Sequence, residues 1–279
     1  MDSVLLAELE DRALNVRRDV VRMMGVARAS YTASSLSVTD ILVWLYGGVL
    51  SVRPSEPLWG ERDRFVLGKG SASPALYATL AERGFFGRDE LWGYRRLGGI
   101  LQAFADFRKT PGVDTSCGSL GMGPGVSLGL ALALKKKGSM ARVFCLLGDG
   151  ELQEGAVWEA LMASAQHRLG NLTLIVDRNG FQMEGETEKI VGLEPLTDKF
   201  EAFGWAFAQA DGHDMAALSD ALSSLPTDRP RVLIAKTILG KGIPSLERST
   251  SNGKVVLDRH MTDEFLKELD DRGTEERKQ

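Results

Sequence analysis

RVFCLLGDGELQEGAVWEALMASAQHRLGNLTLIVDRNG, residues 142–180, is the stretch that decides the fold. It contains two short apolar runs, residues 142–147 and 171–176, which are typical of buried strands. Between them, residues 155–169 carry apolar side chains at helical spacing, and Gly170 follows as a stop signal. The stretch therefore predicts a strand–helix–strand unit with the right-handed crossover of a parallel sheet.

A polar, glycine-containing turn follows each predicted strand: Gly148-Asp149-Gly150 after the first and Asp177-Arg178-Asn179-Gly180 after the second. Because the strands run the same way, we expect Asp149 and Asn179 at the carboxyl edge of the sheet, where open α/β sheets bind ligands. Their oxygens suit Mg²⁺ or Ca²⁺ held together with a substrate diphosphate, and the following helix would point its positive end at the phosphates. GDG alone is also a common strand-to-helix turn, so a purely structural role stays open at this point.

Three more strands are predicted by the same criteria, at residues 64–67, 206–211 and 231–237. The first ends in Gly68-Lys69-Gly70, and Ser73-Pro74 then opens a helix with proline at a permitted early position. This repeats the strand, glycine turn and helix order, so Ser71 is expected at the edge that carries Asp149. With no internal repeat or linker, residues 1–279 are predicted to form a single α/β domain, a doubly wound, mostly parallel sheet with helices on both faces.

The first fifty residues predict two helices with a break at residues 29–35. Ser37 is expected to cap the second helix, residues 38–46, with Asp40 in the capping-box position. Further along, the glycine-rich residues 118–125 lead into another helix. A nicotinamide fingerprint is rejected there, because no strand precedes these glycines.

The composition is that of an ordinary soluble protein, with 43% apolar residues and a net charge of −4. No basic stripe suggests nucleic acid, no apolar run approaches a membrane span, and the charged amphipathic start is no signal peptide. Cys117 and Cys145 do not make a disulfide framework, so a reducing cytoplasm is expected. From Thr262 a short helix is predicted, followed by the charged residues 270–279, which are expected to fray.

GDG followed at this distance by DRNG resembles the thiamine diphosphate motif of the transketolase and 2-oxo acid dehydrogenase superfamily. Further segments resemble the amino-terminal half of a transketolase: FVLGKGSASPALYATLAERGFF (65–86), RKTPGVDTSCGSLGMGPGVSLGLALA (108–133), GDGELQEGAVWEA (148–160), VDRNGFQMEGETE (176–188), LEPLTDKFEAFGW (193–205) and DGHD (211–214). The resemblance covers roughly residues 10–245. It implies the thiamine diphosphate-binding fold, with that cofactor and Mg²⁺ or Ca²⁺ bound.

In that family the cofactor lies between two domains, one holding the diphosphate and metal and the other supplying a glutamate that activates the aminopyrimidine ring. This chain stops where the second domain of a full-length transketolase would begin. The resemblance therefore implies the diphosphate-binding subunit of a split, two-component enzyme. A separate subunit would carry the pyrimidine-binding domain and the activating glutamate, in an α₂β₂ assembly, and this chain alone would be inactive.

The resemblance also assigns site residues. The metal ligands are the side chains of Asp149 and Asn179 and the backbone carbonyl of Phe181. The cofactor-binding positions are Gly118, Leu120, Gly148, Gly150, Glu154 and Asn179. Glu154 matches a glutamate that pairs across the interface with the activating glutamate, although a glutamate favoured by a helix N-terminus is an equally good interpretation without the family.

Four transketolase motifs with histidine depart from the family pattern here. The GH-x-GGSLS, KGH, QGHP and WHG segments correspond to Ser30–Ser37 (SYTASSLS), Lys69-Gly70-Ser71, Gln102–Ala105 (QAFA) and Ser251-Asn252-Gly253. The chain has three histidines, His167, His213 and His260, and none is well placed to replace the four. Tyr31, Ser71 and Phe104, predicted with Glu154 as catalytic residues, would instead form a less basic, more apolar pocket.

Because imidazole is the side chain best suited to moving protons near neutral pH, its absence argues against ordinary pentose phosphate substrates. The sequence thus favours transfer of a two-carbon ketol unit from a ketose or 2-oxo acid donor. A carrier-bound thiol in specialised biosynthesis is one possible acceptor. A 2-oxo acid dehydrogenase-like or acyloin-forming subunit, or a non-catalytic structural partner, is the alternative. The retained Asp149, Glu154 and Asn179 favour an enzyme.

Overall fold

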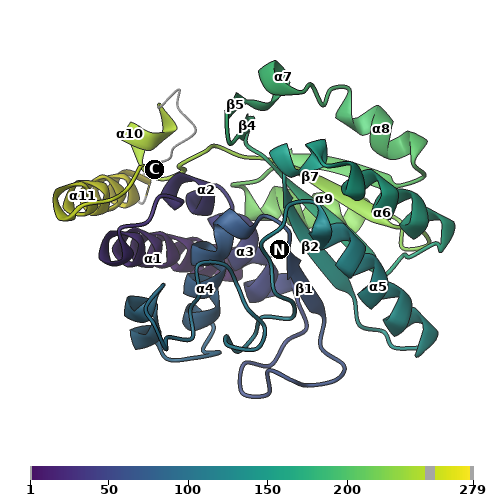
Figure 1. Cartoon of the computed structure of the whole chain (residues 1–279), viewed down its shortest axis with the longest axis horizontal. Helices are drawn as coiled ribbons and strands as arrows, with labels where there is room; N and C mark the ends of the chain where they lie inside the picture. The colour runs from purple at the N-terminus through teal and green to yellow at the C-terminus, as the bar shows by residue number, and fades with distance from the viewer. Residues whose placement is uncertain (1, 249–254, 277–279) are drawn as a thin grey trace.

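A five-stranded parallel sheet forms the centre of the computed structural model, which describes residues 2–248 and 255–276 (Figure 1). From one edge to the other the strands are β1 (Arg64–Leu67), β2 (Val143–Gly148), β3 (Leu172–Arg178), β7 (Arg231–Lys236) and β6 (Ala206–Asp211). All neighbouring pairs are parallel. Each strand lies within two residues of its predicted bounds, because short buried runs ended by glycine, asparagine or proline mark strands clearly.

Helices cover both faces of the sheet, which confirms the doubly wound α/β class (Figure 1). One core is built with α1 (Ser3–Ala27), α2 (Thr32–Leu36), α3 (Thr39–Trp44), α4 (Ser73–Glu82) and α9 (Met215–Ser224). The other is built with α5 (Met122–Lys136), α6 (Gly155–Gln166) and α8 (Leu196–Ala202).

Alternation along β2 explains why both faces are apolar. Phe144 and Leu146 join the first core, whereas Val143, Cys145 and Leu147 join the second. Each is fully buried, and burying a side chain of this kind stabilises the fold by about 1.5–3 kcal/mol. The strand is therefore apolar without interruption, and its turns are left at the carboxyl edge to carry polar groups.

The predicted break at residues 29–35 is confirmed for residues 29–31 and wrong for residues 32–35, and the predicted cap at Ser37 is wrong. Residues 32–36 form α2, and Ser37 follows it; its hydroxyl donates to Asp177 Oδ2 at 2.9 Å. The next helix, α3, begins one residue later than predicted, with Val38 before it and no side-chain cap. A buried hydroxyl here takes a tertiary partner in place of a local backbone N–H.

Asp40 makes no capping box either. Its carboxylate accepts hydrogen bonds from Arg17 at 2.5 Å and from His213 Nδ1 at 2.7 Å. Burial opposes ionisation, but Arg17 and His213 together hold the pKa of Asp40 well below its usual range. The residue therefore ties α1, α3 and the 211–214 turn together.

The charged residues 270–276, which were predicted to fray, are helical in the structure. Helix α11 (Arg259–Glu276) begins before Thr262, includes His260 and packs along α1 (Figure 1). Phe265 and Leu269 are buried in the first core, and such packing holds a helix that its polar composition alone would not favour. Residues 277–279, and the Ser251-Asn252-Gly253 segment, lie outside the described residues.

The remaining elements are short. They are the hairpin β4 (Phe181–Gln182) and β5 (Gly185–Glu186), and the helices α7 (Thr187–Ile190) and α10 (Pro244–Glu247). Short helical segments of one or two turns occur at residues 45–49, 70–72, 88–93 and 150–153. Within the described parts of the chain, no helix is long and apolar enough to cross a membrane.

Candidate active site

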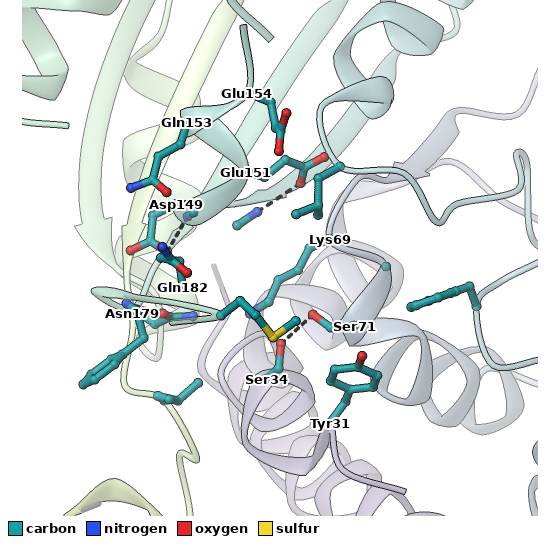
Figure 2. Close-up of a pocket in the computed structure, with 18 of the residues that line it drawn as sticks. Tyr31, Ser34, Lys69, Ser71, Asp149, Glu151, Gln153, Glu154, Asn179 and Gln182 are labelled. Carbon is teal, nitrogen blue, oxygen red and sulfur yellow. Dashed lines mark hydrogen bonds between the residues drawn. The ribbon is translucent and has the colours of Figure 1, made fainter. Parts of the chain in front are cut away.

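A pocket of about 500 Å³ opens where β1, β2 and β3 end (Figure 2). The residues selected from the sequence all line it: Tyr31, Ser71, Phe104, Gly118, Leu120, Gly148, Asp149, Gly150, Glu154, Asn179 and Phe181. Asp149 and Asn179 lie on one side, and Tyr31 and Ser71 on the other (Figure 2). The parallel strands thus bring together groups that are far apart in the sequence.

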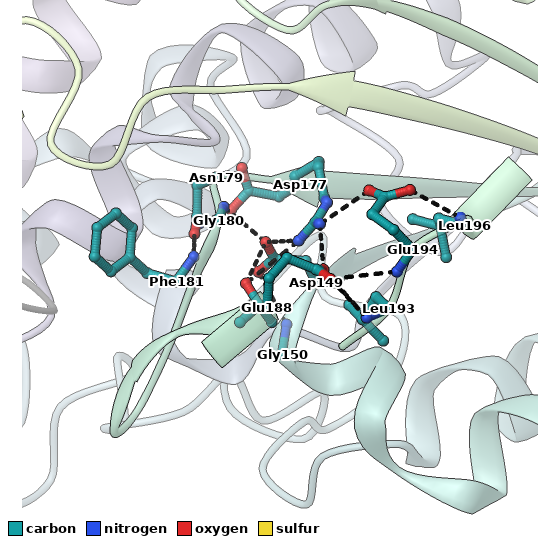
Figure 3. Close-up of polar contacts among 12 residues, drawn as sticks. Asp149, Gly150, Asp177, Asn179, Gly180, Phe181, Glu188, Leu193, Glu194 and Leu196 are labelled. Atoms are coloured by element: carbon teal, nitrogen blue, oxygen red, sulfur yellow. Dashed lines mark hydrogen bonds and ion pairs between the residues drawn. The ribbon is translucent and has the colours of Figure 1, made fainter. Parts of the chain in front are cut away.

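Asp149 is fully buried at the end of β2 (Figure 3). Its Oδ2 accepts hydrogen bonds from Gly180 N at 2.7 Å, Arg178 at 3.0 Å and Thr187 Oγ1 at 3.2 Å, and its Oδ1 accepts from Gly150 N at 2.9 Å. Burial, and then the nearby charge of Asp177, raise the pKa of Asp149, although Arg178 opposes them. A cation at Oδ1 would favour the charged form.

Asn179 is oriented by its neighbours (Figure 3). Its amide nitrogen donates to Asp177 Oδ2 at 2.8 Å, and its Oδ1 accepts from Phe181 N at 2.9 Å. Asp177, as an acceptor, fixes which end of the amide is oxygen. An amide oxygen has two lone pairs, so Oδ1 retains capacity for a cation.

The oxygens at this edge fit a hard divalent cation. Carboxylate, amide and backbone carbonyl oxygens, as at Asp149, Asn179 and Phe181, are the ligands that Mg²⁺ and Ca²⁺ prefer. Within residues 2–248 and 255–276, no three His, Cys, Asp or Glu side chains are grouped to hold a metal ion. A cation here would thus need further oxygens, such as those of a bound phosphate.

The Gly150 turn approaches the β4 strand closely. A Cβ added to Gly150 would lie 2.5 Å from Cβ of Gln182, a distance that side chains do not adopt. Only glycine therefore fits at position 150, and the pocket carries no side chain at that point of its lining.

A buried ion pair that the sequence analysis missed lies beneath the pocket. Lys69 pairs with the fully buried Asp177, which also accepts hydrogen bonds from Ser37, Asn179 and Thr237. The lysine lines the pocket. Its position between two glycines after β1 was the signal available in the sequence, although a lysine there gives no indication of its partner.

Glu151 was also missed. It is 2% exposed and lines the pocket; its Oε1 accepts from Gly121 N at 2.9 Å and its Oε2 from Gly148 N at 3.4 Å. Burial raises the pKa of Glu151 to about 7, against the effect of these two N–H groups. An acidic residue two positions after Asp149 gave only a weak signal.

Glu154 is exposed at the pocket rim (Figure 2). It precedes α6 as the N-cap residue, but its side chain makes no capping hydrogen bond. The residue thus lies at a helix N-terminus, as the alternative interpretation expected, and its carboxylate is exposed.

Hydroxyl and aromatic side chains, those of Tyr31, Ser34, Ser71 and Phe104, line another part of the pocket. Ser71 Oγ lies 2.7 Å from Ser34 Oγ, a pair that the sequence analysis did not select. The rings of Tyr31 and Phe104 lie 6.4 Å apart, centroid to centroid, in a tilted contact.

The three histidines of the chain lie elsewhere. None of them is among the residues that line the pocket. His167 is exposed after α6, and His260 pairs with Glu264 on α11. His213 is held between Asp40 and the N–H of Ile238, which donates to Nε2 at 2.8 Å.

Comparison with known proteins matches the chain to transketolases and their subunits. The family model described as the transketolase, thiamine diphosphate binding domain matches residues 11–265. The chain is 41% identical to a putative uncharacterized transketolase family protein of Sinorhizobium fredii, with 88% of each chain covered. It is 35% identical to a 6-deoxy-6-sulfo-D-fructose transketolase subunit of a Clostridium species, covering 95% of this chain and 98% of the relative.

Two further similarities extend the comparison. The chain is 39% identical to an apulose-4-phosphate transketolase subunit of Actinobacillus succinogenes, covering 86% and 88% of the two chains. Among solved structures, the transketolase of Campylobacter jejuni matches with a TM-score of 0.85 and 30% identity. That match covers 97% of this chain but 43% of the solved one.

Proposed function

The chain belongs to the transketolase family, as its thiamine diphosphate-binding domain, and we propose that it is the diphosphate- and metal-binding subunit of a two-component transketolase. The observation that carries the proposal is the single pocket that collects Asp149, Asn179, Glu154 and the glycine turns at the carboxyl edge. Relatives named as transketolase subunits match this chain over 88% and 98% of their own lengths. A non-catalytic partner would have no need of this pocket chemistry.

The residues at the β2 and β3 ends would hold the cofactor. Asp149, Asn179 and the Phe181 carbonyl would bind Mg²⁺ or Ca²⁺, and Gly148 and Gly150, which line the pocket, would lie against the diphosphate. Gly118 and Leu120 would line the cofactor. When bound, thiamine diphosphate supplies the carbon nucleophile and the electron sink for C–C cleavage.

Glu154 would face the partner subunit. Its carboxylate is exposed at the pocket rim and free of a capping hydrogen bond, so it would be available to pair with the partner's activating glutamate. Two carboxyl groups so paired share a proton and titrate together. The pocket would thereby be completed only in the assembly.

Tyr31, Ser71 and Phe104 would contact the donor. With hydroxyl and aromatic groups in place of imidazoles, this surface lacks the side chain best suited to moving protons near neutral pH. Two of the relatives are named for a sulfonated fructose and for apulose 4-phosphate. We therefore take the donor to be a modified ketose rather than a common pentose phosphate.

The test uses this chain co-expressed with a subunit that carries the pyrimidine-binding domain. Thiamine diphosphate should bind the pair in calorimetric titrations with Mg²⁺, and ketol transfer should require both subunits. Size-exclusion chromatography with light scattering should report an α₂β₂ complex. Separate monomers in the presence of cofactor and Mg²⁺, or no cofactor binding by the pair, would overturn the proposal.

A further inference from the structure

One buried carboxylate joins two glycine turns that line the pocket. Glu151 Oε1 accepts a hydrogen bond from Gly121 N at 2.9 Å, and Oε2 accepts from Gly148 N at 3.4 Å. Gly121 precedes α5 with a left-handed backbone, φ 80°, and Gly148 ends β2. Figure 2 shows Glu151 at the back of the pocket, with one of these bonds drawn.

The carboxylate takes the place of main-chain acceptors at both positions. β1 pairs with β2 only as far as Leu67 and Leu146, so the Gly148 N–H lies beyond that ladder. The Gly121 N–H lies before the first turn of α5. Buried N–H groups need an acceptor, and with Glu151 only 2% exposed, water has little access to supply one.

A third glycine turn packs against the same group. A Cβ added to Gly68, just after β1, would lie 2.8 Å from Oε1 and 2.9 Å from Oε2 of Glu151. Gly121 is equally restricted, since a Cβ there would lie 2.8 Å from Cβ of Glu154. The turns after β1, after β2 and before α5 therefore meet around one carboxylate.

We infer that Glu151 is a positioning residue, which holds the loop carrying Gly118 and Leu120 against the Asp149 turn so that the cofactor pocket is formed before the cofactor binds. The inference rests on the proposed function only for the identity of the ligand. Glu151 acts through Gly121 and Gly148 and needs no contact with the reacting atoms. Preorganisation of this kind improves affinity because less ordering is required on binding.

The variants Glu151→Gln and Glu151→Ala test it. Glutamine keeps the volume and one acceptor oxygen, but turns its NH₂ toward the second N–H; alanine removes both acceptors. Exposed Glu201 on α8 supplies the matched control, Glu201→Gln. Hydrogen–deuterium exchange of the full chain should be faster in residues 118–123 of both Glu151 variants, more so with alanine, and unchanged in α9 and in the control.

The second measurement is cofactor binding by the complex with its partner subunit. The Kd for thiamine diphosphate with Mg²⁺ should rise about tenfold in Glu151→Gln, as expected for loss of one buried hydrogen bond, and further in Glu151→Ala. At saturating cofactor, kcat should return to within about threefold of wild type, because the defect is in the pocket and not in the chemical step. If Glu151 only stabilised the fold, its variants would have a lower melting temperature but the same Kd for thiamine diphosphate as the wild type.

Unchanged exchange in residues 118–123 overturns the inference whether or not the cofactor binds. Faster exchange with an unchanged Kd, or a loss of kcat that saturating cofactor does not restore, also overturns it. Failure of the wild-type complex to bind thiamine diphosphate refutes the proposed function instead, and the exchange result still decides the role of Glu151.

Discussion

On one side of the pocket, Asp149 accepts hydrogen bonds from four groups, whereas on the other the hydroxyl of Ser71 lies against that of Ser34. We call the first the cofactor wall (Gly148–Gly150 and Asn179–Phe181) and the second the substrate wall (Tyr31, Ser34, Ser71 and Phe104). The cofactor wall offers carboxylate, amide and backbone oxygens, whereas the substrate wall offers hydroxyl and aromatic groups and no histidine. We propose that one pocket combines a cofactor chemistry typical of transketolases with a different substrate surface.

The difference has a physical basis. Asp149 of the cofactor wall is fully buried and bonded to four groups, so a change there leaves these groups without partners. Side chains of the substrate wall are half-buried or exposed, and exchanging them leaves the sheet intact. Substrate preference can therefore change while the fold and cofactor site persist.

The largest expected effect concerns the substrate wall as a whole. The complex with its partner should turn over xylulose 5-phosphate plus ribose 5-phosphate with a kcat/KM about 100-fold or more below that for a suitable modified ketose, because general acid–base catalysis by positioned imidazoles contributes about 10²–10⁴-fold. The measurement is a donor panel that includes sulfonated and branched ketoses and 2-oxo acids. Efficient turnover of the two common sugar phosphates would mean that the walls do not differ in function.

The buried ion pair beneath the cofactor wall gives the next effect. Lys69→Met leaves Asp177 charged and buried, and should destabilise the protein by about 3–5 kcal/mol, as for other broken buried pairs. Urea unfolding followed by circular dichroism measures it. The exposed Lys189, on α7, provides the control Lys189→Met, expected within about 0.5 kcal/mol of wild type. A loss of the same small size in Lys69→Met would show that the pair does not support this wall.

The sequence predicted that Asp149 and Asn179 would meet at one sheet edge, where the structure places them, but it predicted none of the network beneath them. Asp149 and Asn179 follow uninterrupted apolar strands and precede glycines, and such signals are local. Lys69 and Asp177 are 108 residues apart, and Glu151 and Gly121 are 30 apart, so their pairing depends on the tertiary fold. Ser37 failed as a cap for the same reason, because its partner Asp177 is distant in the sequence.

The helices also divide into those predicted from local sequence signals and those that depend on tertiary packing. The α6 start at Gly155 was predicted from spacing, and the α4 start from Ser73-Pro74, with proline at a permitted early position. The length of α11 was underestimated because its composition is polar, and its stability comes from Phe265 and Leu269 packed in the core it shares with α1. Local patterns located elements that carry their own signals, and missed those that depend on packing.

Asp149→Asn should weaken thiamine diphosphate binding in the presence of Mg²⁺ by about 100-fold, since an amide offers the cation one neutral oxygen in place of a carboxylate. The folded state should persist, because the amide oxygen can still accept from Gly180 or Arg178. Calorimetric titration of the complex measures the change, with exposed Asp198→Asn on α8 as control. Equal affinities for wild type and Asp149→Asn would show that the metal assignment is wrong.

The smallest expected effect separates the walls most sharply. Ser71→Ala removes one hydroxyl of the Ser34–Ser71 pair, at 2.7 Å, without touching the cofactor wall. Its thiamine diphosphate Kd should stay within about twofold of wild type, while kcat/KM for the preferred ketose should fall about five- to tenfold, as for loss of one neutral hydrogen bond. Ser34→Ala should give a similar change in kcat/KM. The double variant should lose less transition-state free energy than the two single variants lose together, because the hydroxyls are coupled.

Exposed Ser116→Ala is the matched control. If the cofactor Kd rises in Ser71→Ala as much as in Asp149→Asn, the two walls form one binding surface. The distinction between them would then have to be abandoned.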